Sequence, residues 1–146
     1  MSLIMHVGKG SSKIDRNGWV QIPAPMRRNN PLYYEGWMDR ASGYPYLRLG
    51  LFGKEDVIPM DYASIERRHL WQEFIEGEVD GRKGIFLDML AEKMRSWGSE
   101  NVVFAGSMDH VKVFGKTQHE RYAQECFDAG KRIAESKHQP VPPYRA

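Results

Sequence analysis

Apolar and polar residues alternate over short stretches in the first part of the chain, with turn residues between them. Residues 13–22 hold two such stretches on either side of Asp15-Arg16-Asn17-Gly18. The Asn-Gly step supplies the positive φ angles that a tight turn requires, so this pattern predicts a hairpin. A short helix is predicted at residues 26–28, because Pro25 suits a first helical turn, where its missing N–H costs nothing.

The segment that follows has no sustained period. Residues 29–45 are rich in aromatic and turn residues, which indicates a loop or an insertion. Residues 46–52 alternate like a strand and are predicted to pair, across a turn, with a returning strand at 57–60. Asp61 can cap a helix that continues to Phe74, because apolar side chains recur at roughly helical spacing in that stretch.

The same order of elements begins again in the second half of the chain. Residues 78–87 repeat the order strand, Asp, turn Gly, strand, and residues 88–97 predict a short helix. Residues 101–106 and 110–114 predict two strands joined by a turn, and a longer helix is predicted from 117 to 135. The candidate N-caps of these two helices are Asp88 and Thr117.

This repetition predicts an α+β protein with two tandem units that share one core. Residues 1–66 form the first unit, with the insertion at 29–45, and residues 67–135 form the second, with the C-terminal helix. A chain of 146 residues suffices for one compact domain, whereas each half alone is too short to close a core of its own. The proline-rich tail at 136–146 is expected to be extended, either frayed in solvent or laid along a partner.

Composition narrows the classes of function. Apolar runs are only a few residues long, far short of the ~20 residues that a bilayer span needs, and the chain's start lacks the features of a secretory signal. We therefore expect a cytoplasmic protein with no membrane partner. The net charge of +2 is a weak indication of nucleic-acid binding, but several basic side chains gather near the front of the chain.

The residue pattern argues against catalysis. The five histidines are scattered and none has the spacing of a zinc-binding motif, so neither a metal nor another cofactor is expected. Cys126, the lone cysteine, is interpreted as a small apolar residue on a helix. Asp15 and Asp80 each precede a turn glycine, where an aspartate usually caps its own turn. We therefore predict that the protein is not an enzyme.

Several segments, in this order, resemble the MraZ family of bacterial regulators, which consist of two tandem AbrB-like units. Residues 13–27 are similar to the family's Asp-x-x-Gly-Arg turn and to the Ile-Pro-x-x-x-Arg helix start that follows it. Val57-Ile58-Pro59-Met60 resembles its strand-Pro-Leu entry to a long helix, and Arg67-Arg68 lies in a stretch similar to its Arg-Arg helix. The family's closing hairpin and helix are similar to residues 102–106, 111–114 and 120–122.

The resemblance implies an oligomer of small β-barrels, with swapped hairpins and flanking helices, that binds double-stranded DNA in transcription control. The DNA-binding residues that it implies here are Lys13, Asp15, Arg16, Arg27, Arg28, Asp80, Arg82 and Lys83. The chain departs from the family's Asp-x-x-x-Arg motif at both hairpins. Trp19 replaces the arginine in the first hairpin; in the second, one extra residue follows the aspartate and Ile85 stands in the arginine's place.

Two alternatives stay open for these features. The basic residues can simply form a solvated face of a small protein. The chain can also be a non-catalytic structural or assembly subunit of a large complex, ribosomal or organellar, that keeps the fold without reading DNA. Residues 32–46 and the tail would then supply contact surfaces, and the location would be mitochondrial rather than cytoplasmic and nucleoid-associated.

Overall fold

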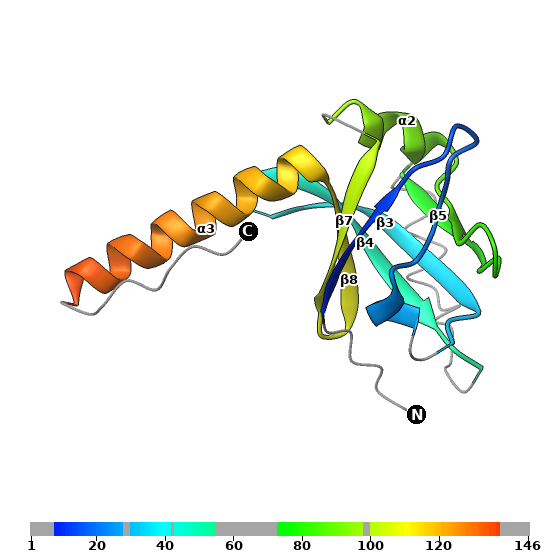
Figure 1. Ribbon diagram of the computed structural model, residues 1–146, viewed down its shortest axis with the longest axis horizontal. Helices are drawn as coiled ribbons and strands as arrows, with labels where there is room; N and C mark the ends of the chain where they lie inside the picture. The colour runs from blue at the N-terminus through cyan, green and yellow to red at the C-terminus, as the bar shows by residue number, and fades with distance from the viewer. Residues whose placement is uncertain (1–7, 28–29, 42, 55–72, 98–99, 138–146) are drawn as a thin grey trace.

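The computed structural model describes residues 8–27, 30–41, 43–54, 73–97 and 100–137 (Figure 1). The predictions for Arg28, the strand at 57–60, the helix from Asp61 up to residue 72 and the tail from residue 138 lie outside these residues. The described part of the chain is an α+β fold of antiparallel strands with two α-helices and one short 3-10 helix.

Six strands form one antiparallel sheet, and two more form a short ribbon. In spatial order the six are β1 (Lys9–Lys13), β7 (Asn101–Ser107), β8 (His110–Gly115), β4 (Tyr44–Phe52), β3 (Tyr33–Ala41) and β5 (Phe74–Glu78). The ribbon consists of β2 (Trp19–Val20) and β6 (Ile85–Phe86). The helical elements are η1 (Ala24–Arg27), α2 (Met89–Arg95) and α3 (Lys116–Ser136). Among the described residues, the strand pairs make two separate sheets and not one closed barrel.

The strand order is symmetric between the two halves of the chain. β1, from the first half, lies at one edge and pairs with β7 from the second half. β5, from the second half, lies at the other edge and pairs with β3 from the first half. β4 and β8 meet at the centre, where Arg48 faces Lys112. Each half therefore completes its part of the sheet with a strand of the other half, which ties both halves into one fold.

The core lies against one face of the six-stranded sheet. Leu47, Leu49 and Phe104 of the sheet and Val20 and Ile85 of the ribbon are all fully buried in this cluster. Helix α2 contributes its three buried side chains, Leu90, Ala91 and Met94. The ribbon is only two pairs long, so its stability depends on this burial more than on its own hydrogen bonds.

Helix α3 begins on the opposite face of the sheet. Val113 belongs to the core, so the side chain of the next residue, Phe114, points to the other face of the strand. There the Phe114 ring stacks on Tyr122 of α3, with 5.3 Å between the ring centroids. Helix α3 contacts β4, β7 and β8 and then runs away from the sheet (Figure 1).

The expectation of a loop or insertion at residues 29–45 is wrong, because β3 occupies most of it. Tyr34, Glu35 and Gly36 are buried in succession, so this strand lacks the alternation that would reveal it. A side chain at Gly36 would place its Cβ 2.8 Å from the Arg48 carbonyl oxygen of the neighbouring strand. The glycine that suggests a turn therefore allows close strand pairing instead.

Two other features of this region were not predicted either. β4 pairs with β3 along its whole length and with β8 over Leu47–Leu49, neither of which was predicted. Phe74, assigned to the end of a helix, is the first residue of β5 and pairs with Trp37. Apolar spacing alone does not separate a helix end from a short strand, and pairing to β3 decides this case.

The second half follows the prediction more closely. The hairpin at 78–87, both strands after residue 100 and the long helix are all present within a few residues of their expected bounds. Helix α3 begins at Lys116 with Gly115 at the N-cap position, so the expected cap at Thr117 is wrong. Asp88 does occupy the N-cap of α2, but its side chain makes no capping hydrogen bond.

Candidate nucleic-acid interface

The first candidate turn links β1 to β2 and is held by the Asp15 carboxylate. Its Oδ1 atom accepts hydrogen bonds from the backbone N–H groups of Asn17, at 2.8 Å, and Trp19, at 3.0 Å. The hydrogen bond from Trp19 lowers the pKa of Asp15 below its usual 3.8; burial acts in the opposite direction, and Asn17 and Gly18 add smaller lowering contributions. The turn exposes Arg16 next to this aspartate.

The second candidate turn links β5 to β6 and is also held by an aspartate. Oδ1 of Asp80 accepts hydrogen bonds from the backbone N–H groups of Arg82 and Lys83, both at 2.8 Å. The Lys83 and then the Arg82 hydrogen bond lower the pKa of Asp80 below 3.8. The side chains of Arg82 and Lys83 are exposed.

The two turns have the same length. Asp15 N–H donates to the Trp19 carbonyl oxygen at 2.8 Å, and Asp80 N–H donates to the Gly84 carbonyl oxygen at the same distance. Gly84 is therefore the structural equivalent of Trp19. Ile85, which the family resemblance puts in the arginine's place, is fully buried and pairs with Val20.

The two carboxylates face their own backbone. Each one satisfies N–H groups that the tight turn would leave without a partner, which is the usual arrangement of an Asx turn. The groups left to contact a ligand at these turns are the basic side chains. Asp15 and Asp80 thus shape the candidate interface and hold the position of their neighbours in sequence.

One contact joins the two turns across the ribbon. The Lys83 ammonium lies 5.4 Å from the centroid of the Trp19 ring, within the range of a cation–π interaction. The Trp19 ring packs on Phe86, with 5.0 Å between centroids, and so has a fixed place on the ribbon. In Figure 1 both turns lie on the side of the molecule opposite α3.

The chain matches no protein-family model and no curated protein. Any assignment of function to the two turns therefore depends on their geometry and their charge.

The other two predicted basic residues in the described part of the chain, Lys13 and Arg27, lie outside the two turns. Lys13, at the end of β1, is exposed and forms a 3.3 Å ion pair with Glu100. Such an exposed pair is weak and leaves the ammonium available. Arg27 is exposed at the end of η1, on an element that packs against β1 rather than on either turn.

Arg95 helps to hold the first turn in place, although it was not among the candidate residues named from the sequence. Its guanidinium, from the last turn of α2, donates a hydrogen bond to the Asp15 carbonyl oxygen. This contact fixes the first turn to a helix of the other half. The sequence does show a basic residue in the last turn of this predicted helix. Its partner, however, is 80 positions away in the chain, so the local sequence pattern does not predict the contact.

The aromatic stretch at residues 32–46, proposed above as a contact surface, largely packs on the molecule itself. Tyr34 and Tyr46 are buried. Tyr44 makes an edge contact with Tyr122 of α3, with 6.2 Å between centroids. Leu32 and Tyr33 are the large apolar side chains of this stretch that stay exposed in the described part of the chain.

Two further findings concern the described residues only. No group of three or more His, Cys, Asp or Glu side chains is placed so that it could hold a metal ion. None of the described helices combines the length and the apolar character that a membrane crossing requires.

Proposed function

We propose that the protein binds double-stranded DNA through the paired turns at residues 15–19 and 80–84 and acts as an oligomeric transcription regulator. The observation that carries this proposal is the equivalence of the two turns. Each is closed by an aspartate and each presents basic side chains, on the same side of the molecule. A paired arrangement of this kind suits the repeated phosphates of a duplex.

The proposed architecture behind this function is a tandem pair of AbrB-like units with swapped hairpins, which together form a small barrel-like core. The strand order supports it, because β1 and β5, β3 and β7, and β4 and β8 occupy equivalent places. The hairpin of each half pairs with strands of the other half, which is the exchange that the MraZ resemblance implies.

At the interface, Arg16, Arg82 and Lys83 would contact phosphate oxygens. An arginine can bind a phosphate with two parallel hydrogen bonds, and a lysine supplies a mobile point charge. Trp19 and Gly84 hold the places where the family resemblance expects arginine, so direct reading of guanine edges is reduced. We therefore expect binding that is sensitive to salt and only modestly selective for sequence.

A salt titration of duplex DNA binding by the full chain tests this proposal. About three phosphate contacts predict that log K falls against log salt with a slope of roughly −3. The variant Arg82→Ala/Lys83→Ala should flatten this slope by about 2. The matched control is Lys131→Ala/Arg132→Ala, which removes the same charge from exposed positions on α3.

The outcomes separate the alternatives. A flattened slope in the turn variant and an unchanged slope in the control support the paired turns. Equal losses in both variants would mean that only the overall charge matters, and the proposed interface would be abandoned. No binding by the wild-type protein at low salt would remove the regulator proposal altogether.

One observation favours the second candidate, a non-catalytic assembly subunit. Helix α3 has 21 residues, and side chains along its later turns, such as Ile133 at 56% exposure, are open to contact. Self-association through α3 would serve the regulator, whereas a different partner chain would serve an assembly. Light scattering of the purified protein distinguishes them: a defined homo-oligomer fits the regulator, and a monomer would favour the assembly subunit.

A further inference from the structure

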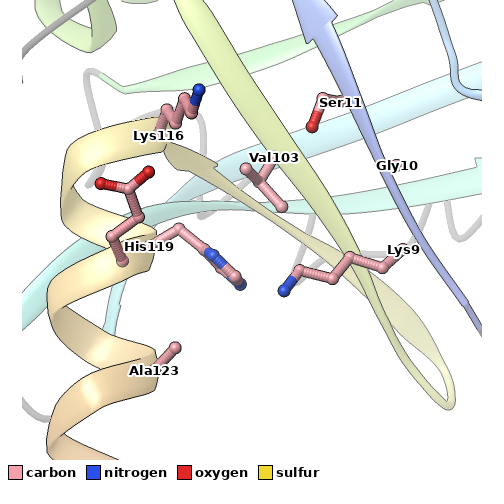
Figure 2. Close-up of a pocket in the computed structure, with 8 residues that line it drawn as sticks. Lys9, Gly10, Ser11, Val103, Lys116, His119 and Ala123 are labelled. Carbon is pink, nitrogen blue, oxygen red and sulfur yellow. The ribbon is translucent and has the colours of Figure 1, made fainter. Parts of the chain in front are cut away.

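A groove lies between β1 and the first turns of α3, away from the paired turns. Its volume is about 360 Å³, and its lining combines basic, hydroxyl and apolar groups. Figure 2 shows the Lys9 side chain reaching from β1 toward the His119 ring of α3. The Ser11 hydroxyl comes from the same face of β1, and Lys116 stands at the upper rim.

The two groups that converge in the groove are held by rigid parts of the fold. His119 makes an edge contact with Phe114, at 5.6 Å between ring centroids, and Phe114 is almost completely buried. Lys9 belongs to β1, whose five residues all pair with β7. A ligand between Lys9 and His119 would therefore meet side chains whose backbones are already in place, which lowers the entropy cost of binding.

The charge of the groove is positive and only partly compensated. Lys9 and Lys116 form no ion pair with a carboxylate of the described residues, and Glu120 is the acidic side chain in the lining. Partial burial, and then the nearby Lys9 charge, lower the pKa of His119 below 6.5, while Glu120 has a smaller opposite effect. The imidazole is thus mainly neutral at neutral pH, and an anion beside it would favour the protonated form.

We propose that this groove binds the phosphate group of a phosphomonoester between Lys9 and His119. The Ser11 hydroxyl also lines the groove, two residues beyond Lys9 on β1. Val103 and Ala123 provide apolar surface for the carbon part of the ligand, and the volume suits a small organic phosphate. Because a backbone phosphate of DNA, although a singly charged diester, also offers anionic oxygens to these side chains, the test must separate the two sources.

This site does not depend on the proposed DNA interface. The paired turns lie on the side of the molecule opposite α3, whereas the groove contains the first turns of α3 (Figure 1). Loss of DNA binding in the turn variant leaves the groove intact. Loss of phosphate binding in a groove variant, in turn, leaves the paired turns intact, so the two proposals can fail separately.

The experiment is an NMR titration of the full chain with glycerol 3-phosphate at constant ionic strength, with sodium chloride as the reference salt. Saturable shifts should concentrate at residues 9–11 and 116–123. Lys9→Ala should weaken binding by about tenfold, and Lys9→Arg should restore most of it. Lys131→Ala, on the far part of α3, is the matched control and should bind like wild type.

His119 supplies a second readout that a merely structural role would not give. The charged groups around it are Lys9 from β1 and Lys116 and Glu120 from its own helix. Bound phosphate should raise the pKa of His119, and affinity should increase as the pH falls from 8 through that pKa. Because the phosphate itself takes up a proton at about pH 6, the pH profile of wild type is compared with that of His119→Gln, which should lose the rise in affinity that protonation of His119 causes while the protein stays folded by circular dichroism.

A duplex oligonucleotide in place of the phosphomonoester identifies the source. Shifts at the groove with the small phosphate assign it to small ligands, and shifts there with DNA alone assign it to the DNA backbone. No saturable shift with either ligand, or unchanged binding in Lys9→Ala, would overturn the proposal.

Discussion

The turns at residues 15–19 and 80–84 share one backbone hydrogen bond, from the aspartate N–H to the carbonyl oxygen four residues later, but they end in opposite kinds of residue. Both are held by an aspartate that accepts two backbone N–H groups. The first ends in Trp19, whose ring covers Phe86, and the second ends in Gly84. A side chain at Gly84 would place its Cβ 2.1 Å from the Val20 carbonyl oxygen. The ribbon thus needs a large side chain on one strand and none at the equivalent place on the other.

The difference between Trp19 and Gly84 allows the two strands of the ribbon to pair. β2 and β6 pair over only two positions, and the backbones approach closely where Gly84 passes the strand of the first half. The Trp19 ring packs on Phe86 and shields it from solvent, which a glycine at the equivalent place cannot do. The two halves thus place their strands at equivalent positions of the sheet order, but the residues at the equivalent places Trp19 and Gly84 differ in size.

The largest expected effect comes from Gly84→Ala. The new Cβ would collide with backbone atoms of Val20 and Gln21, and the residue has a φ of +89°, which an alanine rarely adopts. We expect a loss of at least about 3 kcal/mol in the free energy of unfolding, measured by urea titration. Gly81→Ala, in the same turn and with open space around it, is the control and should change little. Equal stability of the two variants would contradict the close approach.

A smaller effect is expected for Gly18→Ala in the first turn. Its φ is +92°, but the nearest atoms to the new Cβ, on Ala91 and Phe86, lie at an ordinary 3.4 Å. Only the backbone strain should destabilise this variant, so the free energy of unfolding, measured by urea titration, should fall by about 1–2 kcal/mol. A loss as large as that of Gly84→Ala would show that the two turns are equally crowded.

Asp15 and Asp80 should make the contribution of both turns to the stability of the protein depend on pH in the same way. Their pKa values are lower in the folded protein than the usual 3.8, because backbone N–H groups bind the charged form. Their stabilising contribution is therefore present above pH 3.8 and is lost as the pH falls through the lower folded-state value. In thermal melts over this range, Asp15→Asn and Asp80→Asn should each lie below wild type at neutral pH and approach it in acid. A difference that persists in acid would rule out the carboxylate charge as its cause.

The smallest effect is expected for Lys83→Met, which removes the charge over Trp19 but keeps a similar aliphatic length. The exposed cation–π contact is worth about 0.5–1 kcal/mol, so the unfolding midpoint in urea should fall slightly. Trp19 fluorescence should also change, because the ammonium no longer lies near the ring. Identical emission and stability in the variant would mean that the two turns are not coupled through this pair.

Residues in the second half were easier to predict than residues in the first. Asp80 and the turn glycines predicted the hairpin at 78–87, and the sequence pattern after residue 100 predicted a pair of β-strands followed by a long helix. β3 was missed because its buried residues are consecutive and include Gly36, so neither alternation nor composition distinguished it from a loop. Turn chemistry predicted that Asp15 and Asp80 hold their own turns, which the structure confirms, but it did not predict the contact of Arg95 with the first turn.

The sequence by itself determined the local features of this protein: where the chain turns, which aspartates hold those turns and where the long helix runs. These depend on a few neighbouring residues and on their backbone preferences. Only the tertiary structure decided that β1 joins β7, that β5 joins β3 and that Gly84 is the counterpart of Trp19. Those pairings close loops of many residues, and they are selected by the burial of a shared core that no single segment contains.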